Sequence, residues 1–235
     1  MKLRIQKYLS EQGICSRREA EDLIRRGLIS VNGQVVREMG VQIDPETDRV
    51  ELLDRGREVM TEKTTIALHK PRGLVCSRDS SEGETIFDAY PQFLPLNIVG
   101  RLDKDSEGLI LISNDGAITK AVTGDRHVTE KEYEVTVRED IPSNMKRLFE
   151  AGIELEDGPT LPAKVRLISP HTFVIVIREG RKHQIRRMCE FMRLTVTKLK
   201  RIRIAHISLS NLRAGEYRVL TKEEVAPLRE AGKTA

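Results

Sequence analysis

An arginine and a carboxylate stand two residues apart in this chain, shortly before a stretch that reads as a buried strand. Residues 99–103 read as a strand whose two-residue period places Arg101 and Asp103 on one face. Residues 109–112 (Leu-Ile-Leu-Ile) form a short continuous apolar run, which is typical of a strand buried on both faces. The sequence therefore predicts a reactive acid, Asp103, held at the rim of a buried sheet.

Two other interpretations fit the same acidic segment. Asp103, Asp105, Glu107 and Gly108 occupy positions 1, 3, 5 and 6 of a calcium-loop pattern, but position 12, which should be Glu, is Asn114. The flanks also read as strands, whereas a calcium loop lies between helices. On spacing alone, an acidic hairpin tip exposed to solvent is the favoured interpretation.

Two further segments carry polar groups at the edge of a predicted core. Residues 131–137 alternate as a strand, and this places Tyr133 on the inner face, where a core aromatic side chain is the default. Residues 181–192 read as a helix with a buried stripe of Ile185, Met188, Cys189 and Met192. Arg186 borders that stripe and needs a carboxylate partner, because an unpaired buried charge is costly. Arg187 points away from the stripe.

The three segments together resemble the motifs of the pseudouridine synthases. Residues 100–103 read Gly-Arg-Leu-Asp, residues 106–109 fit Ser-x-Gly-Leu, and residues 70–73 resemble the Lys-Pro-x-Gly element of that family. Residues 180–186 resemble its Gly-Arg-x-His-Gln-Ile-Arg motif. The resemblance implies that Asp103 is the catalytic carboxylate, that Tyr133 stacks on the target base and shuttles protons, and that Arg186 pairs with Asp103.

The first 54 residues read as a compact RNA-binding module. A short amphipathic helix is followed by Ser16-Arg17-Arg18-Glu19, a capping box that starts a second helix. Residues 28–36 form a hairpin in which Asn32-Gly33 supplies a type I′ turn. Residues 3–36 resemble the S4 domain, whose helix pair docks on structured RNA with basic residues on phosphates.

Charge placement supports an RNA partner. The formal net charge is only +4, but residues 178–203 hold ten Lys or Arg against two acids, and residues 1–37 hold eight against four. We therefore expect RNA contacts from the basic residues of these segments and from Arg101, which could hold the vacated base position or a phosphate. The residues concerned are Arg4, Lys7, Arg17, Arg18, Arg25, Arg26, Arg101, Arg181, Lys182, Arg187, Lys200, Arg201 and Arg203.

The remaining features narrow the class of protein. The three cysteines are widely spaced and fit no metal or redox pattern, and no nucleotide motif is present, so we expect neither a metal nor a cofactor. The N-terminus lacks the apolar core of a signal peptide and no apolar run could span a membrane, which predicts a cytoplasmic protein. We expect a monomer.

The predicted fold class is α+β, with two domains. An S4-like domain (residues 1–60) is joined by a polar linker (55–63) to a synthase domain (61–235) with a mainly antiparallel sheet. The predicted strands are 65–69, 108–113, 132–138, 163–168, 172–178, 195–200 and 204–209; the predicted helices are 116–123, 142–151, 181–192 and 222–230.

These expectations favour an RNA pseudouridine synthase. The resemblance is greatest to the branch acting on 23S rRNA, one line of which also accepts a tRNA. The alternatives are the same chemistry on 16S rRNA and an S4-type factor that only binds RNA. An RNA-independent glycosidase would need a second carboxylate paired with Asp103, and no convincing partner is visible in the sequence.

Overall fold

The chain divides into two compact units, Met1–Lys63 and Thr64–Ala235. The structure, a computed structural model, describes residues 2–12, 14, 15, 17–56, 63–124 and 129–234. Most of the predicted linker and the Ser16 cap of the predicted capping box lie outside these residues. Each unit has its own core and is described by itself.

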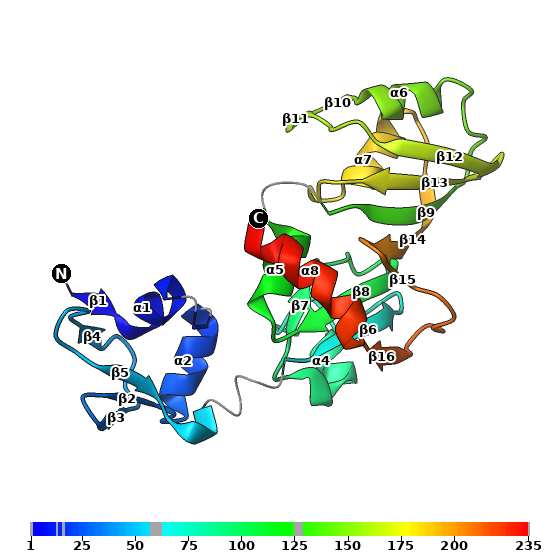
Figure 1. The fold of residues 1–235 in the computed structure, drawn as a ribbon. Helices are drawn as coiled ribbons and strands as arrows, with labels where there is room; N and C mark the ends of the chain where they lie inside the picture. The colour runs from blue at the N-terminus through cyan, green and yellow to red at the C-terminus, as the bar shows by residue number, and fades with distance from the viewer. Residues whose placement is uncertain (1, 13, 16, 57–62, 125–128, 235) are drawn as a thin grey trace. The chain divides into compact units, whose positions relative to one another are not determined.

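The N-terminal unit packs two helices on short strands (Figure 1). Its elements are β1 (Leu3–Arg4), α1 (Ile5–Glu11), α2 (Arg17–Arg25), β2 (Ile29–Val31), β3 (Gln34–Val36), β4 (Gln42–Ile43) and β5 (Val50–Leu52). Strands pair in the order β3-β2-β5, and β1 pairs with β4. Asn32 and Gly33 both have positive φ, 52° and 80°, which confirms the type I′ turn of the predicted hairpin.

The helices of this unit form because their apolar residues recur on one face. Ile5 and Leu9 of α1 and Leu23 and Ile24 of α2 are buried together against Ile29 of β2. The basic residues of α2 lie opposite this face and are exposed. The unit therefore has a closed core and an accessible basic helix surface.

The C-terminal unit is built on one nine-stranded sheet. Its strands are β6 (Thr65–Lys70), β7 (Asn97–Val99), β8 (Glu107–Ser113), β9 (Lys131–Val137), β12 (Lys164–Ser169), β13 (Thr172–Ile177), β14 (Val196–Ile204), β15 (Ile207–Ser208) and β16 (Tyr217–Val219). The order is β12-β13-β9-β14-β8-β6-β16, with β15 on β14 and β7 on β8. The pairs are antiparallel except β14 with β8, so the predicted α+β class with a mainly antiparallel sheet is confirmed.

Helices and a small hairpin complete this unit. They are α4 (Ile86–Ala89), the 3-10 turn η1 (Pro91–Phe93), α5 (Gly116–Thr123), α6 (Met145–Ala151), α7 (Gln184–Phe191), α8 (Lys222–Thr234) and the hairpin β10 (Glu154–Leu155) with β11 (Gly158–Pro159). Figure 1 shows α5 and α8 side by side over the half of the sheet that contains β8, and α6 and α7 at the other half. None of the described helices is long and apolar enough to cross a membrane.

The central strand β8 is buried on both faces, as its apolar run predicted. Leu109 and Leu111 pack with α5 and α8, while Ile110 and Ile112 pack with α4 in the other core cluster. All four side chains are fully buried. A strand covered on both sides is a rigid base for the loop that precedes it.

Candidate active site

Asp103 lies in a loop, not in a strand. The strand β7 ends at Val99, and residues 100–106 form the connection to β8, so the predicted shared strand face of Arg101 and Asp103 is wrong. Gly100 has φ +72°, which turns the chain out of the strand. The backbone N–H of Ser106 then donates to the carbonyl of Asp103 at 3.0 Å, closing a tight turn. The acid is therefore held by a turn at the edge of the buried sheet.

A buried lysine holds this turn through hydrogen bonds. Lys70, the last residue of β6, is fully buried, and its Nζ donates to the carbonyl oxygens of Pro71 (2.9 Å), Ser106 (2.8 Å) and Lys104 (3.4 Å). Burial lowers the pKa of Lys70, and the negative charges of Asp103 and other nearby acids oppose that shift. These bonds connect β6 to Lys104 and Ser106, on the C-terminal side of Asp103, so they restrict where Asp103 can lie.

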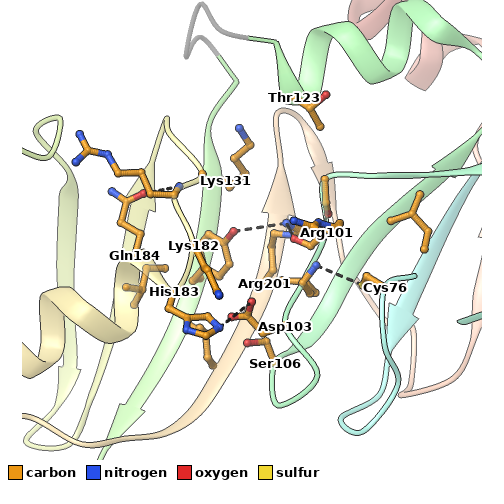
Figure 2. Close-up of a pocket in the computed structure, with 18 of the residues that line it drawn as sticks. Cys76, Arg101, Asp103, Ser106, Thr123, Lys131, Lys182, His183, Gln184 and Arg201 are labelled. Atoms are coloured by element: carbon orange, nitrogen blue, oxygen red, sulfur yellow. Dashed lines mark hydrogen bonds and ion pairs between the residues drawn. The ribbon is translucent and has the colours of Figure 1, made fainter. Parts of the chain in front are cut away.

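A cavity of about 1000 Å³ opens beside the turn (Figure 2). Its lining includes Asp103 and Tyr133 together with basic groups from several elements. The basic lining residues are Arg101, Lys104, Lys131, Arg181, Lys182 and Arg201. The lining carboxylates are Asp103 and Glu82, and a concave site in which basic groups outnumber carboxylates suits an anionic ligand.

A histidine side chain lies next to Asp103. His183 Nε2 lies 3.5 Å from Asp103 Oδ1, and the two side chains face each other in Figure 2. The predicted ion pair of Asp103 with Arg186 is therefore wrong. Instead, Nη2 of Arg186 donates to the backbone carbonyl of Asp105 at 3.4 Å. In the turn that begins at Asp103, it is this later residue that lies next to α7. The side chain of Arg186 therefore contacts the loop of residues 100–106 at a backbone carbonyl.

The buried cation of the site is Arg201, on β14. Its side chain is 2% exposed, and its guanidinium donates to the carbonyls of Leu109 (2.7 Å), Gly100 (2.7 Å) and Arg101 (3.4 Å). Its Nη1 also lies 3.5 Å from the Tyr133 hydroxyl. Among the described residues, no carboxylate lies within ion-pair distance of it. The contact of Arg201 with RNA phosphates therefore stays a prediction; in this structure its side chain lies inside the sheet and binds residues 100, 101 and 109.

A glycine makes this position of Arg201 possible. Strand β14 runs parallel to the start of β8, with Arg201 opposite Gly108. Gly108 has φ +107°, and a Cβ there would lie 2.2 Å from the Arg201 carbonyl oxygen. Only glycine allows the two backbones to approach this closely. The close approach places the Arg201 guanidinium within hydrogen-bond distance of the carbonyls of Gly100 and Arg101.

Tyr133 lies where the alternation of its strand predicted. It is 9% exposed and packs in the core with Val135 and Val137, while its hydroxyl reaches the cavity beside Arg201. The Arg201 guanidinium carbon is 6.0 Å from the Tyr133 ring centroid. Both the structural and the catalytic interpretation of Tyr133 are compatible with this position.

Several arginines predicted to bind RNA have partners within the protein. Arg187 pairs with both carboxylate oxygens of Asp157 (2.7 and 3.0 Å). Arg203 pairs with Glu130 and Glu132. Arg181 binds Glu179 and the hairpin β10–β11. These side chains hold local structure, and their contact with RNA phosphates stays a prediction.

The other predicted RNA contacts remain accessible. The exposed ones are Arg4, Arg17, Arg18, Arg25, Arg26, Arg101 and Lys182; Lys7 and Lys200 are half-buried. Arg25 and Arg26 form i,i+4 ion pairs with Glu21 and Asp22, which are weak in water. The accessible set is therefore concentrated on the helices of the N-terminal unit and the cavity rim.

Sequence reasoning missed the roles of three residues. Lys70 stands out in the sequence only as part of the Lys-Pro-x-Gly element, His183 only as part of the motif of residues 180–186, and Arg201 only as a predicted RNA contact. A signal for Arg201 was present in the sequence, since the apolar Leu199 stands two residues before it and predicts the inner face of β14. The orientation of His183 depends on a left-handed backbone conformation, which its residue type does not predict.

Comparison with known families identifies the class of protein. The model described as RNA pseudouridylate synthase matches residues 64–191, and the S4 domain model matches residues 3–50. The chain therefore belongs to the RNA pseudouridylate synthase family, whose members are isomerases acting on RNA. The family predicted from the motifs is thus confirmed.

Individual relatives match nearly the whole chain. The ribosomal large subunit pseudouridine synthase B of Bacillus subtilis (strain 168) is 37% identical over 235 residues, covering 96% of this chain and 95% of that protein. The dual-specificity RNA pseudouridine synthase RluF of Escherichia coli (strain K12) is 38% identical, with coverage of 96% and 78%. A crystal structure of a pseudouridylate synthase superposes with a TM-score of 0.71 at 33% identity, covering 96% of this chain and 99% of that one.

Proposed function

We propose that this protein converts a specific uridine of large-subunit (23S) ribosomal RNA to pseudouridine, with Asp103 as the catalytic carboxylate. The observation that carries the proposal is the position of Asp103 on a fixed turn, at the wall of a cavity that also contains Tyr133 and Arg201. The large-subunit substrate is suggested by the Bacillus subtilis relative, which is named for it and matches over nearly its whole length.

The chemistry defines what these residues must do. The reaction breaks the glycosidic bond between N1 and C1′ and forms a bond between C5 and C1′. The proton on C5 is released and N1 takes up a proton, so product and substrate are isomers. A uridine in a stacked helix must first be flipped into the cavity. Asp103 then acts either as a nucleophile at the sugar or as a base, and both roles need an ionised carboxylate.

The surrounding groups are suited to these steps. Arg201 holds the backbone on the N-terminal side of Asp103 through Gly100 and Arg101, and Lys70 holds the C-terminal side through Lys104 and Ser106. Fixed groups need no reorganisation when charge develops during the reaction, which lowers the barrier. Tyr133, with its ring in the core and its hydroxyl in the cavity, is suited to contact the flipped base.

RNA binding is assigned mainly to the N-terminal unit. Arg4, Lys7, Arg17, Arg18, Arg25 and Arg26 are proposed to contact phosphates, because they are accessible and lie on a unit that matches the S4 domain. Arg101 and Lys182 extend this contact to the rim of the cavity. We further propose that the protein acts as a monomer in the cytoplasm.

The target is tested by mapping pseudouridine in 23S rRNA, 16S rRNA and tRNAs from cells that lack the protein. Loss of a modification in 23S rRNA supports the proposal, and an additional loss in a tRNA would show dual specificity. Loss in 16S rRNA alone would contradict the assigned substrate. Reintroduced D105N should restore the modification and D103N should not, since both changes remove a carboxylate from the same turn but only Asp103 lines the cavity.

A further inference from the structure

His183 has a backbone conformation that is uncommon for residues other than glycine. Its φ and ψ are 53° and 24°, in the left-handed region, which Asn, Asp and His enter more often than other residues with a side chain. The residue precedes the first turn of α7 and gives it no side-chain cap. Asn and Gly would also tolerate this backbone. Local structure therefore gives no reason for a histidine here.

The surrounding network enforces this conformation without using the imidazole. Gln184 is buried and its amide donates to Glu179, while the backbone N–H of Arg181 donates to the Gln184 side chain at 3.3 Å. Arg181 Nε donates to Glu179 at 3.1 Å and its Nη1 to the Gly158 carbonyl at 2.8 Å. The loop before α7 is thus held on both sides of His183. A disfavoured backbone persists only when its surroundings hold it, and such positions cluster at functional sites.

The imidazole contacts the reactive carboxylate. His183 Nε2 is 3.5 Å from Asp103 Oδ1, and their side chains are 49% and 39% exposed. Water competes for both groups in the free protein, so the contact strengthens when RNA covers the cavity and excludes water. The backbone conformation of His183 and its distance from Asp103 thus both indicate a role that involves the Asp103 carboxylate.

We propose that His183 is a positioning residue that orients the Asp103 carboxylate for reaction by donating from Nε2 to Oδ1. This inference rests on the proposed role of Asp103. Because the contact joins two protein groups, its loss should slow the chemical step and leave RNA affinity nearly unchanged. The imidazole also provides the reach that explains why histidine stands where Asn or Gly would fit the backbone.

Two substitutions at His183 separate the side chain from the backbone. H183N and H183G both tolerate the left-handed conformation, but neither side chain reaches Asp103. We expect each to lower the single-turnover rate on a 23S rRNA transcript by at least about tenfold, equivalent to about 1.4 kcal/mol of barrier. The Kd for the same transcript should stay within about twofold of wild type. H183Q, whose amide nitrogen can reach the Nε2 position, should recover most of the rate.

A matched control is available at the other end of the same helix. Arg193 also has a left-handed φ, 59°, and is exposed. R193N relieves the same kind of backbone conformation far from Asp103 and should leave the rate unchanged.

The outcomes distinguish this inference from the proposed function. A wild-type rate in H183N or H183G would overturn the positioning role, and so would H183Q as slow as H183N. An inactive wild-type protein, or an active D103N, would instead overturn the proposed function. A wild-type protein that is active, with D103N inactive and H183N fast, would refute only the role of His183.

Discussion

Replacing Arg201 with lysine should weaken the attachment of the catalytic loop, residues 100–106, to the sheet while the protein stays folded. The guanidinium makes two short bonds, 2.7 Å each, to the carbonyls of Gly100 and Leu109. Lysine keeps the charge but has a single nitrogen on a shorter side chain. It therefore cannot donate to both carbonyls as the planar guanidinium of Arg201 does. At least one of the two carbonyls then loses its donor.

The cost follows from the charge of the donor. A hydrogen bond to a charged group contributes about 1.5–3 kcal/mol, so R201K should lower the free energy of unfolding by about that amount. Domains of this kind have about 5–15 kcal/mol of stability, so the variant remains folded. Displacement of the loop by about 1 Å would lower the rate of the chemical step by about 100-fold.

Two measurements on R201K test these numbers. Urea denaturation gives the change in the free energy of unfolding, and single-turnover tritium release from C5-labelled uridine gives the rate. R203K is the control, because Arg203 lies two residues along the same strand and pairs with Glu130 and Glu132 outside the cavity. It should change stability by no more than about 1 kcal/mol and keep the wild-type rate. Equal rate defects in R201K and R203K, or a wild-type rate in R201K, would refute the role of Arg201.

Two further predictions concern RNA binding and pH. Deletion of residues 1–63 should weaken binding to structured RNA and flatten its salt dependence, since phosphate contacts set that slope; an unchanged slope would contradict the role of the N-terminal unit. Burial, together with the charge of Arg201, lowers the pKa of Lys131 from 10.5 to about 8. The charged form of Lys131 therefore destabilises the folded state relative to the unfolded state, and this destabilisation is complete below about pH 8. K131M should therefore exceed wild type in unfolding free energy below about pH 8, and the difference should disappear as the pH rises towards 10.5; a difference independent of pH would contradict this.

The sequence predicted the elements whose patterns are local. The apolar run of β8 and the alternation of β9 each specify the buried faces of a strand, and both are confirmed, including the inward position of Tyr133. The helix α7 buries Ile185, Met188 and Cys189 as its periodicity indicated. Patterns of this kind depend only on neighbouring residues.

The arrangement around Asp103 could not be predicted in the same way. The turn 103–106 is held by Lys70, which is more than thirty residues away in the chain. Arg201 reaches it only because β14 runs parallel to β8 at Gly108. The error over Arg186 has the same origin, because a helical projection locates a residue on its helix but not the element opposite. Long-range register decided these contacts.

The central claim, that Asp103 carries out uridine isomerisation, is tested most directly by tritium release from 23S rRNA labelled at C5 of uridine. Wild-type protein and D105N should release tritium, and D103N should release none while binding the same RNA with an affinity within about threefold of wild type. Undiminished tritium release by purified D103N would contradict the claim.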